Sequence, residues 1–245
     1  MDLSQLPVTD GFRQRGEQVT RLETFVDAAF AFAVTLLVVS FQSMPHDFDT
    51  LYDALRRLPA FVAGFAILAL FWSGHDRFSR RTGLEDGISR TLGLALVAAT
   101  LFYVYPLRMV MSSGMHFLTG GWAPSELTVT SFDQFRFIFV LYGAGFAILA
   151  AILALLNRHA LRRADALGFD AAEQELLRGS ALSYQVLIAT ALLSAAVSLA
   201  MPQDYRMAPM PGVVYSLLGV VLPILGRRNR RRVQALVASR SARTQ

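Results

Sequence analysis

The chain has 245 residues, of which 54% are hydrophobic and 17% are charged, and its formal net charge is +5. With a mean hydropathy of +0.43, its apolar content exceeds what one soluble core of this length needs, so the composition predicts an integral membrane protein. Because cysteine is absent, disulfides, thiolate metal sites and cysteine nucleophiles are excluded.

Six stretches are apolar and long enough for a helix to cross a bilayer of roughly 30 Å. They are residues 24–41, 51–72, 91–111, 137–156, 182–201 and 207–225. The sequence therefore predicts an all-α integral membrane protein with six transmembrane helices over 24–225. Segment 1–23 lacks the features of a signal peptide, so the first helix is expected to remain as an anchor. Segment 226–245 is a basic tail.

Proline, glycine and capping residues predict how some of these helices are interrupted. Pro106 is expected to kink the third helix or to end its regular part, and three prolines interrupt the sixth. Residues 169–179 read as a separate surface helix. Asp170 would cap it, Glu173 would complete a capping box, and Gly179 would end it.

Arginine placement predicts the orientation in the membrane. Eighteen of the 23 basic residues lie in the N-terminal segment, the second and fourth loops and the tail, on one side of a six-helix arrangement. The other five are Arg56, Arg57, Arg108, Arg136 and Arg206. This asymmetry predicts that segment 1–23 and tail 226–245 are both cytoplasmic.

The basic tail permits two interpretations, because clustered arginines neutralise phosphates of nucleic acids as well as of lipids. A cluster directly after a membrane-spanning helix is more typical of a topology signal or of contact with anionic lipids. We therefore expect the lipid bilayer, with anionic lipids at the tail, and no nucleic acid as a partner.

Sites for catalysis are scarce in this sequence. The four histidines are scattered, without metal-binding spacing, and there is no glycine-rich phosphate loop or Gly-x-Ser-x-Gly motif. No carboxylate lies at the centre of a predicted span, where a proton relay would need one. We expect neither an enzyme nor a bound metal or cofactor.

The first predicted helix carries an apolar stripe interrupted by one hydroxyl. The stripe is formed at steps of three or four by Phe25, Ala29, Phe32, Leu36 and Val39. Thr35 lies at its edge. On spacing alone, the stripe fits lipid contact or helix packing, with the Thr35 hydroxyl bonded to the backbone four residues earlier.

An acid at the mouth of this helix needs a partner. Asp27 follows Arg21 by six residues, so the two side chains point about 120° apart and cannot form an i,i+4 pair. The end of the second helix lies at the same level and offers Trp72, His75 and Arg77. Asp27 is thus either a first-turn carboxylate stabilised by the helix dipole or part of a polar clamp that fixes the angle of the first helix.

These two segments together resemble a known family. Arg21, Phe25 and Asp27, followed by an apolar run with Thr-Leu-Leu, are similar to the first helix of the transmembrane protein 175 family, the lysosomal potassium channels and their prokaryotic relatives. Trp72 and His75 resemble that family's Trp-x-x-His-His motif. Six spans in about 245 residues match the single-repeat prokaryotic form over nearly the whole chain.

The resemblance implies a potassium-permeable cation channel, assembled as a homotetramer with the first helices around a central pore. It implies that Phe32, Leu36 and Val39 line the pore as an apolar constriction and that Thr35 forms an ion-selectivity layer. Potassium is then the permeant ion rather than a cofactor.

Three residues depart from the family pattern. Val26 replaces the motif serine, Asp76 replaces the second histidine, and Phe32 stands where the family usually has isoleucine or leucine. We expect Asp76 to weaken or rewire the clamp, since it adds a negative charge near Asp27, and we expect the wider Phe32 ring to tighten the resting pore.

Two other functions remain open at this point. A secondary transporter of a small cation or solute would be expected to show an internal repeat with broken helices meeting at mid-membrane. A structural membrane subunit would use the apolar stripe only to pack against a partner.

Overall fold

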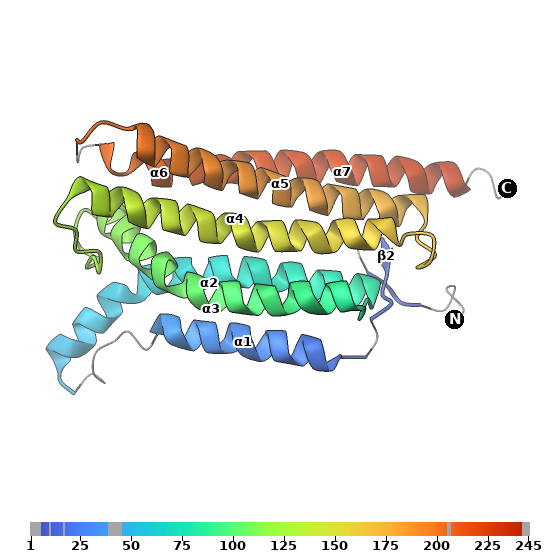
Figure 1. The fold of residues 1–245 in the computed structure, drawn as a ribbon, viewed down its shortest axis with the longest axis horizontal. Helices are drawn as coiled ribbons and strands as arrows, with labels where there is room; N and C mark the ends of the chain where they lie inside the picture. Colours follow the sequence, from blue (N-terminus) through green and yellow to red (C-terminus); the bar gives the residue numbers. More distant parts are fainter. Residues whose placement is uncertain (1–5, 10, 17, 39–45, 205–206, 242–245) are drawn as a thin grey trace.

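The structure, a computed structural model, describes residues 6–9, 11–16, 18–38, 46–204 and 207–241. Long helices dominate it, and they lie along one common axis (Figure 1). The elements are β1 (Val8–Thr9), β2 (Phe12–Arg13), α1 (Arg21–Val38), α2 (Phe48–Thr82), α3 (Gly87–Leu118), α4 (Phe132–Arg162), α5 (Ala171–Ala200), α6 (Met210–Val213), the 3-10 helix η2 (Val214–Leu217) and α7 (Leu218–Ser241).

Five of the described helical segments are long and apolar enough to cross a membrane. They are Phe48–Thr82, Gly87–Leu118, Phe132–Arg162, Ala171–Ala200 and Met210–Ala238. The sixth predicted span corresponds to the last of these, and the first corresponds to α1. With 18 residues, α1 is about 27 Å long, but Arg21, Glu23 and Asp27 interrupt its apolar character near the start.

The helices run back and forth along the bundle. The start of α1, strand β2 and the C-terminal end of α7 all lie at the same end (Figure 1). Helix α4 is central and packs on α2, α3 and α5, whereas α1 packs on α2 and α3 and α7 packs on α5. Helix α1 therefore forms one edge of the bundle and α7 the opposite edge (Figure 1).

The prediction of a separate surface helix over 169–179 is right about where the helix begins and wrong about where it ends. The predicted capping box is confirmed, because the carboxylates of Asp170 and Glu173 each accept from the other residue's backbone N–H. However, the helix then continues without a break, with Gly179 inside it. Gly179 marks a close approach of α7 instead of a helix end, since a β carbon there would collide with the side chain of Asn229.

Proline has different effects in the third and sixth predicted spans. Helix α3 continues through Pro106, and Figure 1 shows that this helix is bent. The last span divides into α6, η2 and α7 near its start, while Pro223 lies inside α7. The arginine-rich sequence after residue 225 is helical as well, so the transition from apolar to basic residues occurs within α7.

A small hairpin precedes α1, which the sequence analysis did not anticipate. Strands β1 and β2 pair antiparallel, and Gly11 next to them has a φ of 78°, a left-handed conformation that glycine adopts without steric cost. Phe12 is fully buried, with its ring centroid 5.4 Å from that of Phe169. The N-terminal segment is thereby attached to the loop between α4 and α5.

Candidate functional site

Helix α1 begins at a capping box that the sequence analysis missed. The backbone N–H of Glu23 donates to the Thr20 hydroxyl at 3.1 Å, and the Glu23 carboxylate accepts from the Thr20 backbone N–H at 3.4 Å. The Thr-x-x-Glu spacing was the available signal. Because of this cap the helix begins at Arg21, three residues before the predicted start of the span.

One face of α1 is buried against α2 and α3. Val26 and Ala33 are fully buried, and Leu37 is nearly so. A β carbon on Gly64 of α2 would lie only 3.0 Å from Leu37, so the glycine allows the two helices to approach closely. Val26, one of the departures from the family pattern, fills a fully apolar position in this contact.

The opposite face of α1 is open. Phe25 and Phe32 are 52% and 54% exposed, and the Thr35 side chain is exposed beside them. Leu36 is only partly buried. Ala29 belonged to the predicted stripe but is buried. The exposed face of α1 is centred closer to Thr35 than the predicted stripe was. The predicted position Val39 lies outside the described residues.

Thr35 makes the local contact that its spacing allowed. Its hydroxyl donates to the backbone carbonyl of Ala31 at 3.1 Å. Since the proton points back along the helix, the oxygen lone pairs remain available on the exposed face. A hydroxyl held in this way presents an acceptor rather than a donor to whatever lies in front of α1.

A hydrogen bond joins α1 to α2 near the start of α1. The indole Nε1 of Trp72 donates to Oδ1 of Asp27 at 2.8 Å. His75 is buried one turn further along α2, within electrostatic range of Asp27. Arg21 lies exposed at the first position of the helix. The structure thus brings Asp27, Trp72 and His75 together, while Phe25 and Arg21 face outward.

The charge that Asp76 introduces is paired within its own helix. Its Oδ1 accepts from Nε of Arg80 at 2.7 Å, one turn further along α2. Arg80 is also within electrostatic range of Asp27 and Glu23. The additional carboxylate of Asp76 is therefore paired with the guanidinium of Arg80, and Trp72 remains the hydrogen-bond donor to Asp27.

The segment before α1 is fastened by a buried ion pair. Both guanidinium NH groups of Arg15 donate to the carboxylate of Glu173, each at 3.0 Å, and the two side chains are only 5% and 1% exposed. Arg13 adds a 2.6 Å contact to Asp170. Nothing in the local sequence links residues this far apart in the chain, so this contact was not predictable from spacing.

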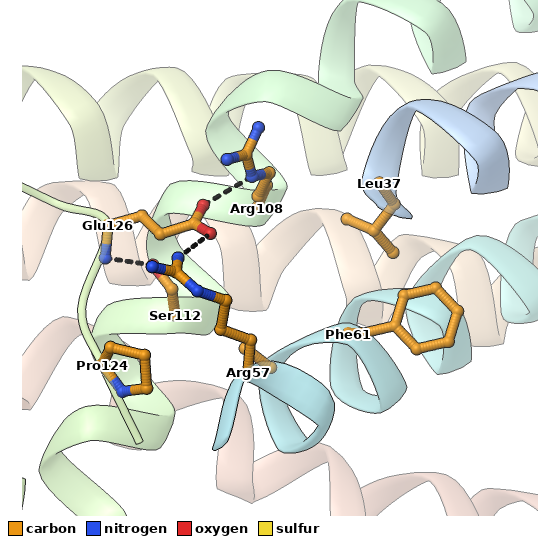
Figure 2. Close-up of a pocket in the computed structure, with 8 residues that line it drawn as sticks. Leu37, Arg57, Phe61, Arg108, Ser112, Pro124 and Glu126 are labelled. Atoms are coloured by element: carbon orange, nitrogen blue, oxygen red, sulfur yellow. Dashed lines mark hydrogen bonds and ion pairs between the residues drawn. The ribbon is translucent and has the colours of Figure 1, made fainter. Parts of the chain in front are cut away.

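The C-terminal end of α1 borders a second charged cluster, shown in Figure 2. Glu126, in the loop between α3 and α4, accepts from Arg57 of α2 at 2.8 Å and from Arg108 of α3 at 2.5 Å. Leu37 contributes to the same small cavity, whose volume of about 20 Å³ suffices for about one water molecule. The cluster fastens a loop to the helices; it does not form a substrate pocket.

Asp86 stabilises the opposite end of the bundle, where α3 begins. Although burial raises its pKa, hydrogen bonds from the backbone of Ser89 and from His159 lower the pKa of Asp86 to about 2. His159 Nε2 lies 2.6 Å from Asp86 Oδ2, so the cap of α3 also contacts α4. Within the described ranges, no three His, Asp or Glu side chains converge as a metal site.

Comparison with known proteins gives consistent matches. Residues 21–106 match the family described as the endosomal/lysosomal potassium channel TMEM175. A potassium channel of Marivirga tractuosa is 28% identical over 222 residues, which cover 88% of this chain and 90% of that protein. A crystal structure of a variant of the potassium channel MtTMEM175 has a TM-score of 0.75 and 27% identity, covering 92% of this chain and 100% of that chain.

The family match spans α1, α2 and the first part of α3, the helices that carry the exposed stripe and the Asp27–Trp72 hydrogen bond. The similarity in structure extends over nearly the whole bundle. Taken with the helix geometry, these matches show that the chain is similar to the TMEM175 potassium channels, in sequence over its first three long helices and in fold over nearly its whole length.

Proposed function

We propose that this protein is a potassium-permeable cation channel, assembled as a homotetramer of six-span subunits, in which α1 of each subunit lines a central pore. The observation that carries the proposal is the exposed face of α1, where Phe25, Phe32 and Thr35 lie together at the edge of the bundle. A face that only contacts lipid needs no hydroxyl. The potassium channels with which this chain shares its fold support the same function.

Each exposed residue has a physical role in this proposal. Four Phe32 rings around an axis form an apolar constriction, which closes a pore by excluding water. Leu36 extends the constriction along α1, and Val39, which lies outside the described residues, is the third position proposed for it. Four Thr35 hydroxyls form a layer whose oxygens replace part of the hydration shell of K⁺, the permeant ion. No cofactor is required.

In this proposal Asp27 positions α1 and does not bind the ion. Asp27 and Phe32 are five residues apart, which places their side chains about 140° apart around the helix. The hydrogen bond from Trp72 therefore holds α1 from the side facing α2 and directs Phe32 away from it. Of the other residues of the helix-clamp motif, His75 lies next to this hydrogen bond on α2, whereas Arg21 and Phe25 lie on the exposed side of α1.

The proposed orientation places both termini in the cytoplasm of a bacterium, with the channel in the inner membrane. The excess of arginines in the terminal segments and in the second and fourth loops favours that side. The described N-terminal hairpin and the end of α7 lie at the same end of the bundle, which is consistent with an even number of spans (Figure 1).

The absence of cysteine makes the shared axis directly testable. A single Phe32→Cys or Thr35→Cys variant carries one thiol per subunit. If four α1 helices meet at an axis, oxidation in membranes yields covalent dimers on a non-reducing gel. Leu192→Cys is the matched control, because Leu192 is 57% exposed on α5, far from the proposed axis. Monomeric Phe32→Cys and Thr35→Cys, or equal cross-linking of the control, would contradict the proposal.

A further inference from the structure

A groove of about 880 Å³ opens between α5, α7 and the C-terminal part of α2. Three arginines line it, Arg77, Arg81 and Arg230, and none of the described lining residues is acidic. A concave surface with three guanidinium groups and no lining carboxylate attracts an anion. Most lining residues of the groove belong to α5 and α7, which lie on the opposite side of the bundle from α1 (Figure 1), so the groove is separate from the proposed pore.

Two of these arginines contact aromatic residues, one through a hydroxyl and one through a ring. Arg77 and Arg81 are one turn apart on α2 and share a face. Arg77 is hydrogen-bonded to the hydroxyl of Tyr184, and the guanidinium carbon of Arg81 lies 5.3 Å from the ring centroid of Phe12. Neither of these two contacts brings a carboxylate into the lining of the groove.

The third arginine is positioned by the contact between α5 and α7. Asn229 lies directly over Gly179, where no larger residue fits, and this brings its neighbour Arg230 to the groove. The carboxylate of Glu175 on α5 does not line the groove. It pairs with Arg232 at 3.2 Å, and the side chains of Arg232 and Arg230 point about 160° apart around α7.

The level of the groove along α7 indicates the kind of anion. Val220 and Ile224 are exposed apolar residues directly before Leu225 and Gly226, which line the groove. The arginine-rich part of the helix follows. A molecule bound here therefore has apolar surface on one side and guanidinium groups on the other, and guanidinium pairs well with phosphate oxygens. We propose that this groove binds the phosphate headgroup of an anionic phospholipid.

The test compares lipid binding by the purified full-length protein and two triple variants, measured by native mass spectrometry. Arg77→Gln/Arg81→Gln/Arg230→Gln removes the groove arginines. The matched control removes three tail arginines that do not line it, in the variant Arg227→Gln/Arg228→Gln/Arg231→Gln. Wild type is expected to prefer phosphatidylglycerol over phosphatidylcholine, and the groove variant is expected to lose at least about tenfold in phosphatidylglycerol affinity. The control is expected to lose much less.

Equal losses in both triple variants would overturn the proposal, because they would indicate general attraction to a basic tail. Arg230→Gln alone, at an exposed position, keeps the test valid if the triple variant does not fold; we expect an affinity loss of about fivefold. Soluble glycerol phosphate is the third arm. If it binds as tightly as phosphatidylglycerol, the site serves a soluble phosphate compound and the lipid assignment is wrong.

Discussion

At the scale of single residues, the contact between Asp27 and Trp72 is central. It joins α1 and α2 through residues 45 positions apart in the chain, with a 2.8 Å hydrogen bond to a carboxylate. Hydrogen bonds to charged groups are stronger than neutral ones, and an indole has only one donor to offer. The bond therefore favours one rotational setting of α1 relative to α2.

Replacing that donor tests its contribution. We expect Trp72→Phe to lower the free energy of unfolding by about 1 kcal/mol, because a smaller aromatic ring takes the place of the indole, the N–H is lost, and the site is partly exposed. For a chain of this size the melting temperature should fall by roughly 2–4 °C in a thermal unfolding experiment in detergent.

Trp122→Phe is the matched control, since Trp122 is similarly exposed and its indole reaches only the Tyr52 hydroxyl, at 3.4 Å. We expect no measurable change in its melting temperature. A Trp72→Phe protein as stable as the Trp122→Phe protein would mean that the hydrogen bond to Asp27 does not hold α1.

At the scale of elements, the N-terminal hairpin fastens the start of α1 to α5. The chain leaves β2, passes Arg15 and Gly16, and enters α1 at Arg21, five residues after Gly16. The Gly16 backbone N–H donates to the carbonyl of Arg80 on α2 at 3.0 Å, and Arg15 reaches Glu173 on α5. Any movement of the start of α1 would have to pull on these contacts.

The buried ion pair between Arg15 and Glu173 is expected to dominate this attachment. Removing one partner of a buried pair leaves an uncompensated charge, which typically costs about 3 kcal/mol. We therefore expect Glu173→Gln to lower the melting temperature and to increase hydrogen–deuterium exchange in the described part of the segment before α1.

Glu175→Gln on the same helix is the matched control. Glu175 pairs with Arg178 and Arg232, whose side chains are largely exposed. Exposed pairs contribute less than about 1 kcal/mol, so exchange before α1 should stay as in the wild type. If both variants behave alike, the buried pair does not anchor the hairpin.

The positions of the long helices could be predicted from the sequence, but one of their ends could not. The long apolar stretches located five membrane-spanning segments, and the spacing of Asp170 and Glu173 located the start of α5. Gly179 was misinterpreted as a helix end, because the residue that requires a glycine there is Asn229 on another helix. Close approaches between helices leave no mark in the local sequence.

The candidate site was predictable to a similar degree. Spacing placed Phe32 and Thr35 on one side of the first helix and Asp27 on another, and both residues of the stripe are exposed in the structure. Ala29 was included in the stripe although it is buried, because periodicity alone does not fix where neighbouring helices pack. The pairing of Arg15 with Glu173 depends on contacts across 158 positions, which no local pattern encodes.

At the scale of the whole molecule, α1 lies at one edge of the bundle and turns one apolar face away from it (Figure 1). Helices α4 and α5 form the most extensive contact in the bundle, whereas α1 packs on α2 and α3 and leaves its other face exposed. In the proposed tetramer this edge faces the axis, and the groove near α7 faces the surrounding lipid.

The most direct test of this account is potassium flux into liposomes that contain the purified protein. We expect Phe32→Ala to raise the flux severalfold, because the apolar constriction widens, and Thr35→Ala to change the ratio of potassium to sodium flux. Phe102→Ala is the control, since Phe102 is 64% exposed on α3 and lies outside the proposed pore; its flux should equal that of the wild type. If neither Phe32→Ala nor Thr35→Ala changes the flux of correctly folded protein, α1 does not line the pore.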